Sequence, residues 1–142
     1  MKFVVKQGLV LPEMGAHRAR VTSVTETTAK TKQKTPQLEV SFKCEDGKSI
    51  RKWYNLVGWE HDAEGDVVFK NDKPVPSKEK TADCMNILGV DAFRMGAGGA
   101  DDSIDTNALV GCECGIQVEP NINGKPSVEK IYSVEYLESI LA

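Results

Sequence analysis

A strictly alternating segment and the turn that follows it constrain this fold more than any other feature of the sequence. From Gln37 to Cys44 apolar and polar residues alternate, which is typical of a β-strand with one buried face. The next four residues contain Asp46-Gly47, a pair whose positive φ angles suit a tight hairpin turn. Residues 49–56 then return as a second strand. The chain is therefore expected to be built around an antiparallel sheet.

Three more strands and one helix are expected along the chain. The first strand covers residues 17–28, where Val21 and Val24 share a face only if a β-bulge lies between them. A helix is predicted from Ser77 to Leu88, with Gly89 ending it. The last two strands, 109–119 and 128–136, form a hairpin around an Asn-Gly turn within residues 121–125.

This order of three strands, a helix and two strands is that of the five-stranded Greek-key barrel called the OB-fold. The expected fold class is therefore mainly β, with one OB-fold domain covering residues 1–142. Two irregular segments interrupt it. They are a long loop at about 57–76, with a small hairpin near 67–69, and a mobile, small and acidic loop at about 96–106.

Charge is unevenly distributed along the chain. The net charge is −3, but residues 17–54 contain nine Lys or Arg against four Asp or Glu, which leaves the rest of the chain at −8. Such asymmetry can place a cationic face on an acidic protein, which a polyanion-binding protein needs. A solvated, lysine-rich hairpin is the alternative interpretation.

Several classes of protein are not expected. No apolar run approaches the roughly 18 residues of a membrane-spanning helix, and residues 2–11 lack the apolar core and cleavage site of a secretory signal. The four cysteines are then expected to be reduced thiols in a cytoplasmic protein. Neither His17 nor His61 lies in a known nucleophile pattern, and no phosphate- or dinucleotide-binding glycine motif occurs. Neither an enzyme nor a bound cofactor is expected.

The cysteines leave one alternative open, a structural zinc site. Cys112 and Cys114, together with Cys44 and Cys84, offer four sulfur ligands. The C-x-C spacing on a strand fits zinc less well than the usual C-x2-C knuckle. The three strand cysteines also fall on apolar faces, where a thiol packs as a small hydrophobic group. No metal site is therefore expected.

The third strand carries the strongest candidate for a binding site. Arg51-Lys52-Trp53-Tyr54 places two cations before two aromatic rings, and these groups contact the phosphates and bases of a single-stranded nucleic acid. Because side chains alternate along a strand, either Arg51 and Trp53 face outward or Lys52 and Tyr54 do. The alternative is that an aromatic ring belongs to the core.

Further candidates flank this strand. Three are cations on the first two strands, where simple solvation is the alternative: Arg18, Arg20 and Lys43. Others lie on the two loops that border the ligand groove in OB-folds, namely Lys30, Lys32 and Lys34 on one loop and Asn121, Asn123 and Lys125 on the other. Trp59, in the long loop, is either a stacking platform or a lid over the barrel end.

The chain resembles the OB-fold single-stranded DNA-binding proteins of bacteriophages in four places. These are the strand at 15–24, the hairpin at 38–54 with its Trp-Tyr ending, the helix end at 86–89, and Leu109-x-Gly111 before the fourth strand. The resemblance implies binding of single-stranded DNA, with RNA as an alternative ligand, at low sequence specificity. It also implies a role in phage DNA replication or recombination, alongside the proteins of those processes, in the cytoplasm of a bacterial host.

The C-terminal residues depart from this family. Many such proteins end in a disordered acidic tail that recruits partners, whereas residues 136–142 here are mostly apolar. A packed or self-associating C-terminus is expected instead, which keeps a homodimer open.

Two other functions could use the same barrel. A protein-interaction or assembly module would present Trp53, Tyr54 and Trp59 to a partner protein, and its binding would resist salt. An oligosaccharide-binding barrel would stack its aromatic rings on sugars, and the lysines would be incidental. Binding that weakens as salt rises favours the nucleic-acid hypothesis.

Overall fold

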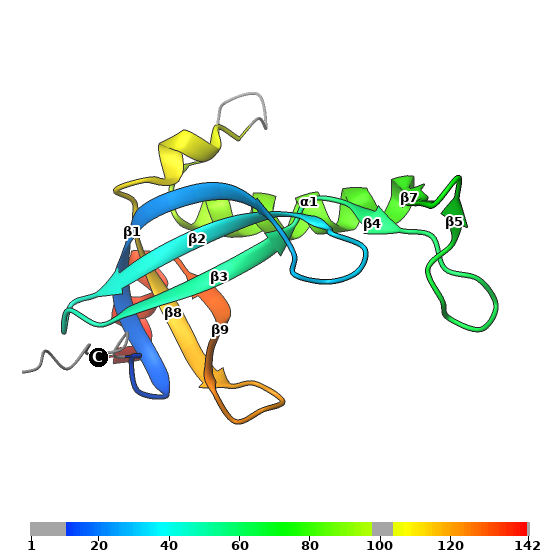
Figure 1. Ribbon diagram of the computed structural model, residues 1–142. Helices are drawn as coiled ribbons and strands as arrows, with labels where there is room; N and C mark the ends of the chain where they lie inside the picture. The colour runs from blue at the N-terminus through cyan, green and yellow to red at the C-terminus, as the bar shows by residue number, and fades with distance from the viewer. Residues whose placement is uncertain (1–10, 98–103, 142) are drawn as a thin grey trace, which may run out of the picture.

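The computed structural model describes residues 11–97 and 104–141 and is mainly β with one main helix (Figure 1). Its strands are β1 (Gly15–Thr28), β2 (Pro36–Cys44), β3 (Ser49–Asn55), β4 (Gly58–Trp59), β5 (Phe69–Lys70), β6 (Lys73–Pro74), β7 (Pro76–Ser77), β8 (Glu113–Pro120) and β9 (Pro126–Tyr132). Its helical segments are α1 (Lys78–Arg94), a 3-10 turn at Thr106–Leu109, and α2 (Val134–Leu141).

Five of the strands form one antiparallel sheet in the order β3-β2-β1-β8-β9. The sheet curves, so that its two edge strands, β3 and β9, approach each other (Figure 1). A hydrogen bond from Lys52 Nζ to the Val128 carbonyl oxygen, at 3.1 Å, joins the two edges. The sheet is not closed into a barrel, because β3 and β9 are its ends rather than paired neighbours. The predicted mainly β class is confirmed.

β1 serves both halves of the sheet. Its first part, up to Arg20, pairs with β8, and from Ala19 onward it pairs with β2. The register of β1 against β2 shifts between Val21 and Ser23. This is the bulge that the sequence predicts, and it keeps Val21 buried and Val24 packed against the same core.

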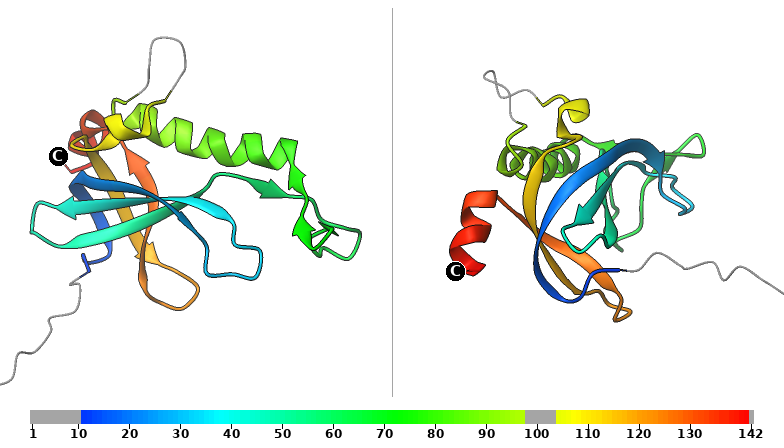
Figure 2. Two further views of the ribbon diagram at one scale, coloured as in Figure 1. Left: turned by 45° about the horizontal axis from the view of Figure 1, so that its top comes forward. Right: turned by 90° about the vertical axis from the view of Figure 1, so that its left-hand side faces the viewer.

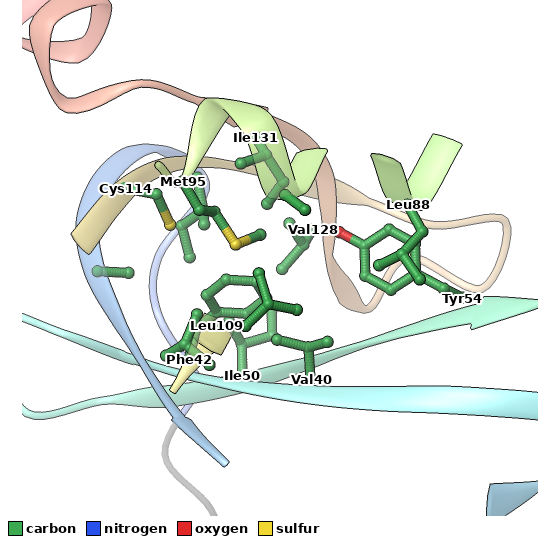
Figure 3. Close-up of a cluster of buried hydrophobic side chains, with 14 of the residues drawn as sticks. Val40, Phe42, Ile50, Tyr54, Leu88, Met95, Leu109, Cys114, Val128 and Ile131 are labelled. Atoms are coloured by element: carbon green, nitrogen blue, oxygen red, sulfur yellow. The ribbon is translucent and has the colours of Figure 1, made fainter. Parts of the chain in front are cut away.

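The core lies between the curved sheet and α1 (Figure 3). Apolar side chains from both halves of the sheet meet the helix there, namely Val40, Phe42, Ile50, Tyr54, Cys114, Val128 and Ile131 from the strands and Leu88 from α1. Each such side chain contributes about 1.5–3 kcal/mol when fully buried. The alternation of β2 is confirmed, since Leu38, Val40 and Phe42 are each at most 1% exposed.

α1 begins where the sequence predicts but ends later. Ser77 is its N-cap, and the Ser77 hydroxyl accepts a hydrogen bond from the backbone N–H of Lys80. The predicted end at Gly89 is wrong, because the helix continues to Arg94. Gly89 lies close to Ile104, whose Cδ1 would be 3.3 Å from an added Cβ. This glycine allows close packing inside the helix and does not terminate it.

The segment predicted as a long loop, residues 57–77, is a paired arm. β4 pairs with β7, an isolated bridge joins His61 to Val67, and β5 pairs with β6 as the expected small hairpin, shifted to 69–74. The arm extends away from the sheet together with the first turns of α1 (Figures 1 and 2). Gly58 permits their close approach, because an added Cβ would lie 2.2 Å from the Cβ of Lys80.

β8 begins later than predicted. Residues 106–109 form a 3-10 turn, and Gly111 adopts a φ of 89°, which interrupts extended backbone until Glu113. Val110, which the strand predicted at 109–119 would place on the same face as Cys112 and Cys114, is therefore 51% exposed. Most of the loop predicted at 96–106 lies outside the described residues.

Residues 134–136, predicted as strand, instead begin helix α2. The Ser133 hydroxyl accepts a hydrogen bond from the Tyr136 backbone N–H at 3.2 Å and so starts the helix. Leu137 is buried against Gly115 of β8, so the expected packing of the apolar C-terminal segment holds for this residue, whereas Tyr136, Ile140 and Leu141 are exposed. No helix in the described residues is both long and apolar enough to cross a membrane.

Candidate nucleic-acid interface

β3 presents Arg51 and Trp53 on the outer face of the sheet. Trp53 is 51% exposed, whereas Tyr54 is only 3% exposed. This decides between the two orientations that the sequence allows. Trp53 offers a ring to solvent, with the guanidinium of Arg51 two residues away on the same face.

Tyr54 is a core residue, so its prediction as a stacking side chain is wrong. Its hydroxyl donates a hydrogen bond of 2.7 Å to the carboxylate of Asp91 in α1, and both residues are buried. Burial raises the pKa of Tyr54, and the charge of Asp91 raises it further. Burial likewise raises the pKa of Asp91, while the hydrogen bond from Tyr54 opposes that rise. The pair fixes α1 on β3.

We expect Tyr54→Phe to destabilise the protein without changing its affinity for nucleic acid. The variant keeps the ring in the core but leaves the buried carboxylate of Asp91 without its hydrogen-bond donor, a loss of about 1–3 kcal/mol in the free energy of unfolding. Chemical denaturation measures the first effect and oligonucleotide titration the second. If the variant remains folded at the assay temperature but binds nucleic acid more weakly, Tyr54 contributes to the binding site after all.

Lys52 also points away from the outer face. Its ammonium donates to the Val128 carbonyl oxygen of β9 and lies 5.3 Å from the ring centroid of Tyr54. The side chain therefore bridges the two edges of the sheet. Its predicted contact with phosphate is not favoured by this position.

A groove of about 460 Å³ runs beside Trp53 on the outer face. Its walls come from β3 and from the turn between β8 and β9, and its other residues come from β1, β2 and the segment before β1. The lining residues are Leu11, Thr22, Ser23, Ser41, Ser49, Ile50, Arg51, Trp53, Asn121, Lys125 and Pro126. Small hydroxyl side chains from three strands thus lie beside an indole ring and two cations.

Glu39 of β2 orients the two main groups of this groove, a role that the sequence analysis missed. The Trp53 indole Nε1 donates to Glu39 Oε2 at 3.1 Å, and Arg51 Nε lies 3.6 Å from Glu39 Oε1. β2 and β3 pair so that Glu39 lies opposite Trp53. The alternation of residues 37–44 already places Glu39 on the polar face of its strand, but its pairing with Trp53 was not predicted, because the sequence left the orientation of the next strand open.

Arg18 and Arg20 lie on the same outer face but are paired with carboxylates. Glu113 of β8 accepts from Arg18 Nη2 at 2.9 Å and from Arg20, and Arg18 also contacts Glu45 and Glu138. The hydrogen bonds from the two arginines lower the pKa of Glu113, and the same contact raises that of Arg18. Simple solvation, the alternative considered above, therefore does not describe them.

These arginines and Lys43 line a second hollow of about 240 Å³. Thr22 of β1 lines both this hollow and the groove beside Trp53, so the two are neighbours on one face. Lys43 is exposed and has no ion-pair partner among the described residues. Among the described residues it is the one cation lining this hollow that has no carboxylate partner.

The turn between β1 and β2 carries the three predicted loop lysines, Lys30, Lys32 and Lys34, and all three are exposed. The turn is structured rather than irregular, since the Ala29 N–H donates to the Thr35 carbonyl and Lys34 adopts a φ of 50°. Within the described chain none of the three lysines forms an ion pair. The ammonium groups are thus available to a polyanion.

Trp59 ties this basic turn to the arm. Its indole Nε1 donates to Thr35 Oγ1 at 2.9 Å, and the residue is half-buried. It acts in this structure as an anchor between two loops rather than as an open stacking platform. The tips of the β1–β2 and β8–β9 hairpins project on the same side of the sheet (Figures 1 and 2).

In the β8–β9 turn, Asn121 forms the turn rather than pointing to a ligand. Its Oδ1 accepts from the backbone N–H groups of Asn123 and Lys125, at 2.9 and 3.0 Å. The Lys125 side chain is exposed and borders the groove. Of the candidates in this turn, Lys125 is best placed to reach a phosphate.

The four cysteines are free thiols. Burial raises the pKa of Cys44 to about 11 and that of Cys114 to about 12, so both remain protonated at neutral pH. Among the described residues, no three His, Cys, Asp or Glu side chains gather as a metal site would require. The expectation that the three strand cysteines pack as hydrophobic groups holds for the buried Cys44 and Cys114, and Cys112 is partly buried against the same core.

Sequence comparison adds no relative to this picture. No protein-family model and no curated protein matches the chain. The groove beside Trp53 and the cations around it are therefore the basis for proposing a function of this protein.

Proposed function

We propose that this chain is a non-enzymatic, single-stranded DNA-binding protein of low sequence specificity. The observation that carries the proposal is the exposed Trp53 beside Arg51, in a groove bordered by Lys125 of the β8–β9 turn, with the lysine-bearing β1–β2 turn on the same side of the sheet (Figures 1 and 2). An exposed indole can stack on any base, and Arg51, Lys125 and the β1–β2 lysines can contact the phosphates on either side. Neither stacking on the indole nor contact with the phosphates depends on the edge of a base, so the expected sequence specificity is low.

The topology supports an OB-type frame for this site. The order β3-β2-β1-β8-β9, with β1 shared by both halves and α1 between β3 and β8, is the strand order of a five-stranded Greek-key barrel. In OB-folds the ligand crosses the face of the second and third strands, between the first and last hairpin loops. Trp53 lies on the corresponding face. The resemblance to phage proteins supports a role in phage DNA replication or recombination.

An assembly function through the aromatic residues has less support. It would use Trp53, Tyr54 and Trp59 together, but Tyr54 is buried and Trp59 is anchored to Thr35. The isolated ring of Trp53 suits a base better than a protein interface, whose anchors usually cluster.

Titration of a labelled oligo-dT of about 30 nucleotides tests the proposal, with fluorescence anisotropy and tryptophan emission recorded together. We expect binding that quenches tryptophan and weakens linearly on a logarithmic salt scale, with a slope of about −0.7 per phosphate contacted. A duplex of the same length, expected to bind more weakly, is the control. No binding of oligo-dT at low salt would refute the function.

A further inference from the structure

The outward face of α1 is apolar on its C-terminal half. Val90 is 50% exposed, Ile87 58% and Phe93 77%. They lie on the side opposite Leu88 and Ala92, which pack into the core. Single exposed apolar residues are normal, but three within two turns of one helix indicate an interaction surface.

Four residues of this face form a stripe along the helix. Asp83, Ile87, Val90 and Arg94 are separated by four, three and four positions, which is heptad spacing and keeps them on one side of α1. The stripe is acidic at its first position, apolar at the two central positions and basic at its last. A hollow of about 330 Å³ lies along its second half, lined by Asn86, Ile87, Val90, Asp91 and Arg94.

This order of charges is self-complementary. When two such helices pack antiparallel about a two-fold axis, Ile87 of each faces Val90 of the other. The same arrangement places Asp83 of each opposite Arg94 of the other. We propose that the protein forms a homodimer in which the Asp83–Arg94 stripe of α1 packs antiparallel against the same stripe of a second copy.

Charge complementarity favours a second copy over an unrelated helix. Another protein would have to carry the same acidic, apolar and basic order in reverse, whereas a second copy supplies it by symmetry. Arg94 is already held in place, since its Nη1 donates to the Ile131 carbonyl at 3.3 Å and lies 3.8 Å from Asp91 Oδ1, while its side chain remains 49% exposed and can meet a second carboxylate. The guanidinium therefore loses little conformational freedom when it meets Asp83 of the second copy.

The proposed interface leaves the candidate DNA-binding groove open. α1 and the tips of the β1–β2 and β8–β9 hairpins lie on opposite sides of the molecule (Figure 2, left). The dimer goes beyond the proposed function and does not depend on it. A contact between two helices is smaller than the roughly 1,600 Å² of a standard interface, so we expect a concentration-dependent equilibrium.

Sedimentation equilibrium of the full chain over a wide range of protein concentration tests this interface. The average mass is expected to rise from that of one chain to that of two. Val90→Lys should weaken association at least tenfold, whereas Val110→Lys, at a position equally exposed but outside α1, should leave it unchanged. A monomer at every concentration, or a dimer that Val90→Lys leaves intact, would overturn the proposal.

Charge reversal tests the antiparallel order. Asp83→Lys places like charges opposite each other and should weaken the dimer, and the double variant Asp83→Lys/Arg94→Glu should restore it. Because Arg94 also contacts Ile131 and pairs with the buried Asp91, the melting temperature of the double variant is measured first. If it does not fold, Ile87→Lys, at an exposed position, replaces it and should weaken the dimer as Val90→Lys does. A folded double variant that does not regain association would overturn the antiparallel arrangement, as would an Ile87→Lys dimer of wild-type strength.

Discussion

Replacing Trp53 with alanine is expected to weaken oligo-dT binding by about 1–3 kcal/mol, roughly fivefold to 150-fold in the dissociation constant. Stacking of a base on an aromatic side chain supplies this energy, and Trp53 is the one aromatic side chain among the described residues that lines the groove. Its ring is half-exposed on the outer face, so the substitution leaves the core intact and the melting temperature nearly unchanged. Anisotropy titrations at several salt concentrations measure the loss.

Salt dependence makes this experiment specific. An indole carries no charge, so Trp53→Ala should lower the affinity by the same factor at every salt concentration and leave the salt slope unchanged. Trp53→Phe is the control, because it keeps a stacking ring but loses the hydrogen bond to Glu39. It should retain most of the affinity. If Trp53→Ala binds as tightly as the wild type, the nucleic acid does not cross this face.

The hairpin of β2 and β3 could be predicted from the sequence because its information is local. Alternation fixes which face is buried, and Asp46-Gly47 fixes the turn, as the pairing of Phe42 with Ile50 bears out. The extent of α1 could not be predicted in this way. Gly89 has the appearance of a helix terminator, but it lies inside α1, where its missing side chain leaves room for Ile104, fifteen positions along the chain.

In the candidate site, too, the local features could be predicted from the sequence and the long-range contacts could not. The sequence identified Arg51-Lys52-Trp53-Tyr54 but left two orientations open, because either set of alternate side chains could face the core. The buried hydrogen bond between Tyr54 and Asp91 decides between them, and it joins elements far apart in the chain. α2 is a different case, since Ser133 followed by apolar residues at helical spacing was a readable signal.

Residues 17–54 offer a ligand less positive charge than their composition indicates, because strand pairing brings some of their cations against carboxylates from distant parts of the chain. Arg20 lies opposite Glu113 only because β1 and β8 are neighbours in the sheet. Glu113 then neutralises part of the cluster that the sequence predicts for phosphate binding. Among the described residues, the lysines of the β1–β2 turn are the largest group on this side of the molecule without carboxylate partners, and Lys43 and Lys125 add to them.

Replacing Lys30, Lys32 and Lys34 together with alanine is therefore expected to lower oligo-dT affinity at low salt on the order of tenfold to a hundredfold. Each lysine that neutralises a phosphate releases a counterion, so the salt slope should become shallower by about 2 in the triple variant. This outcome differs from that of Trp53→Ala, which changes the affinity but not the slope. The turn is solvent-exposed, so the free energy of unfolding should change little.

A second triple variant, used as a control, tests whether the position of these lysines matters or only the net charge of the protein. Lys70, Lys73 and Lys78 are exposed on the arm and at the start of α1, so their replacement with alanine changes the charge by the same amount. Charges separated from a ligand by more than about 10 Å are largely screened at moderate salt, so the arm variant should bind nearly as the wild type does. If both triple variants lose the same oligo-dT affinity, binding depends on the net charge of the protein and not on the proposed groove. A loss confined to the β1–β2 turn would place the DNA backbone beside Trp53, because the same hairpin that carries these lysines continues into the strand that pairs with β3.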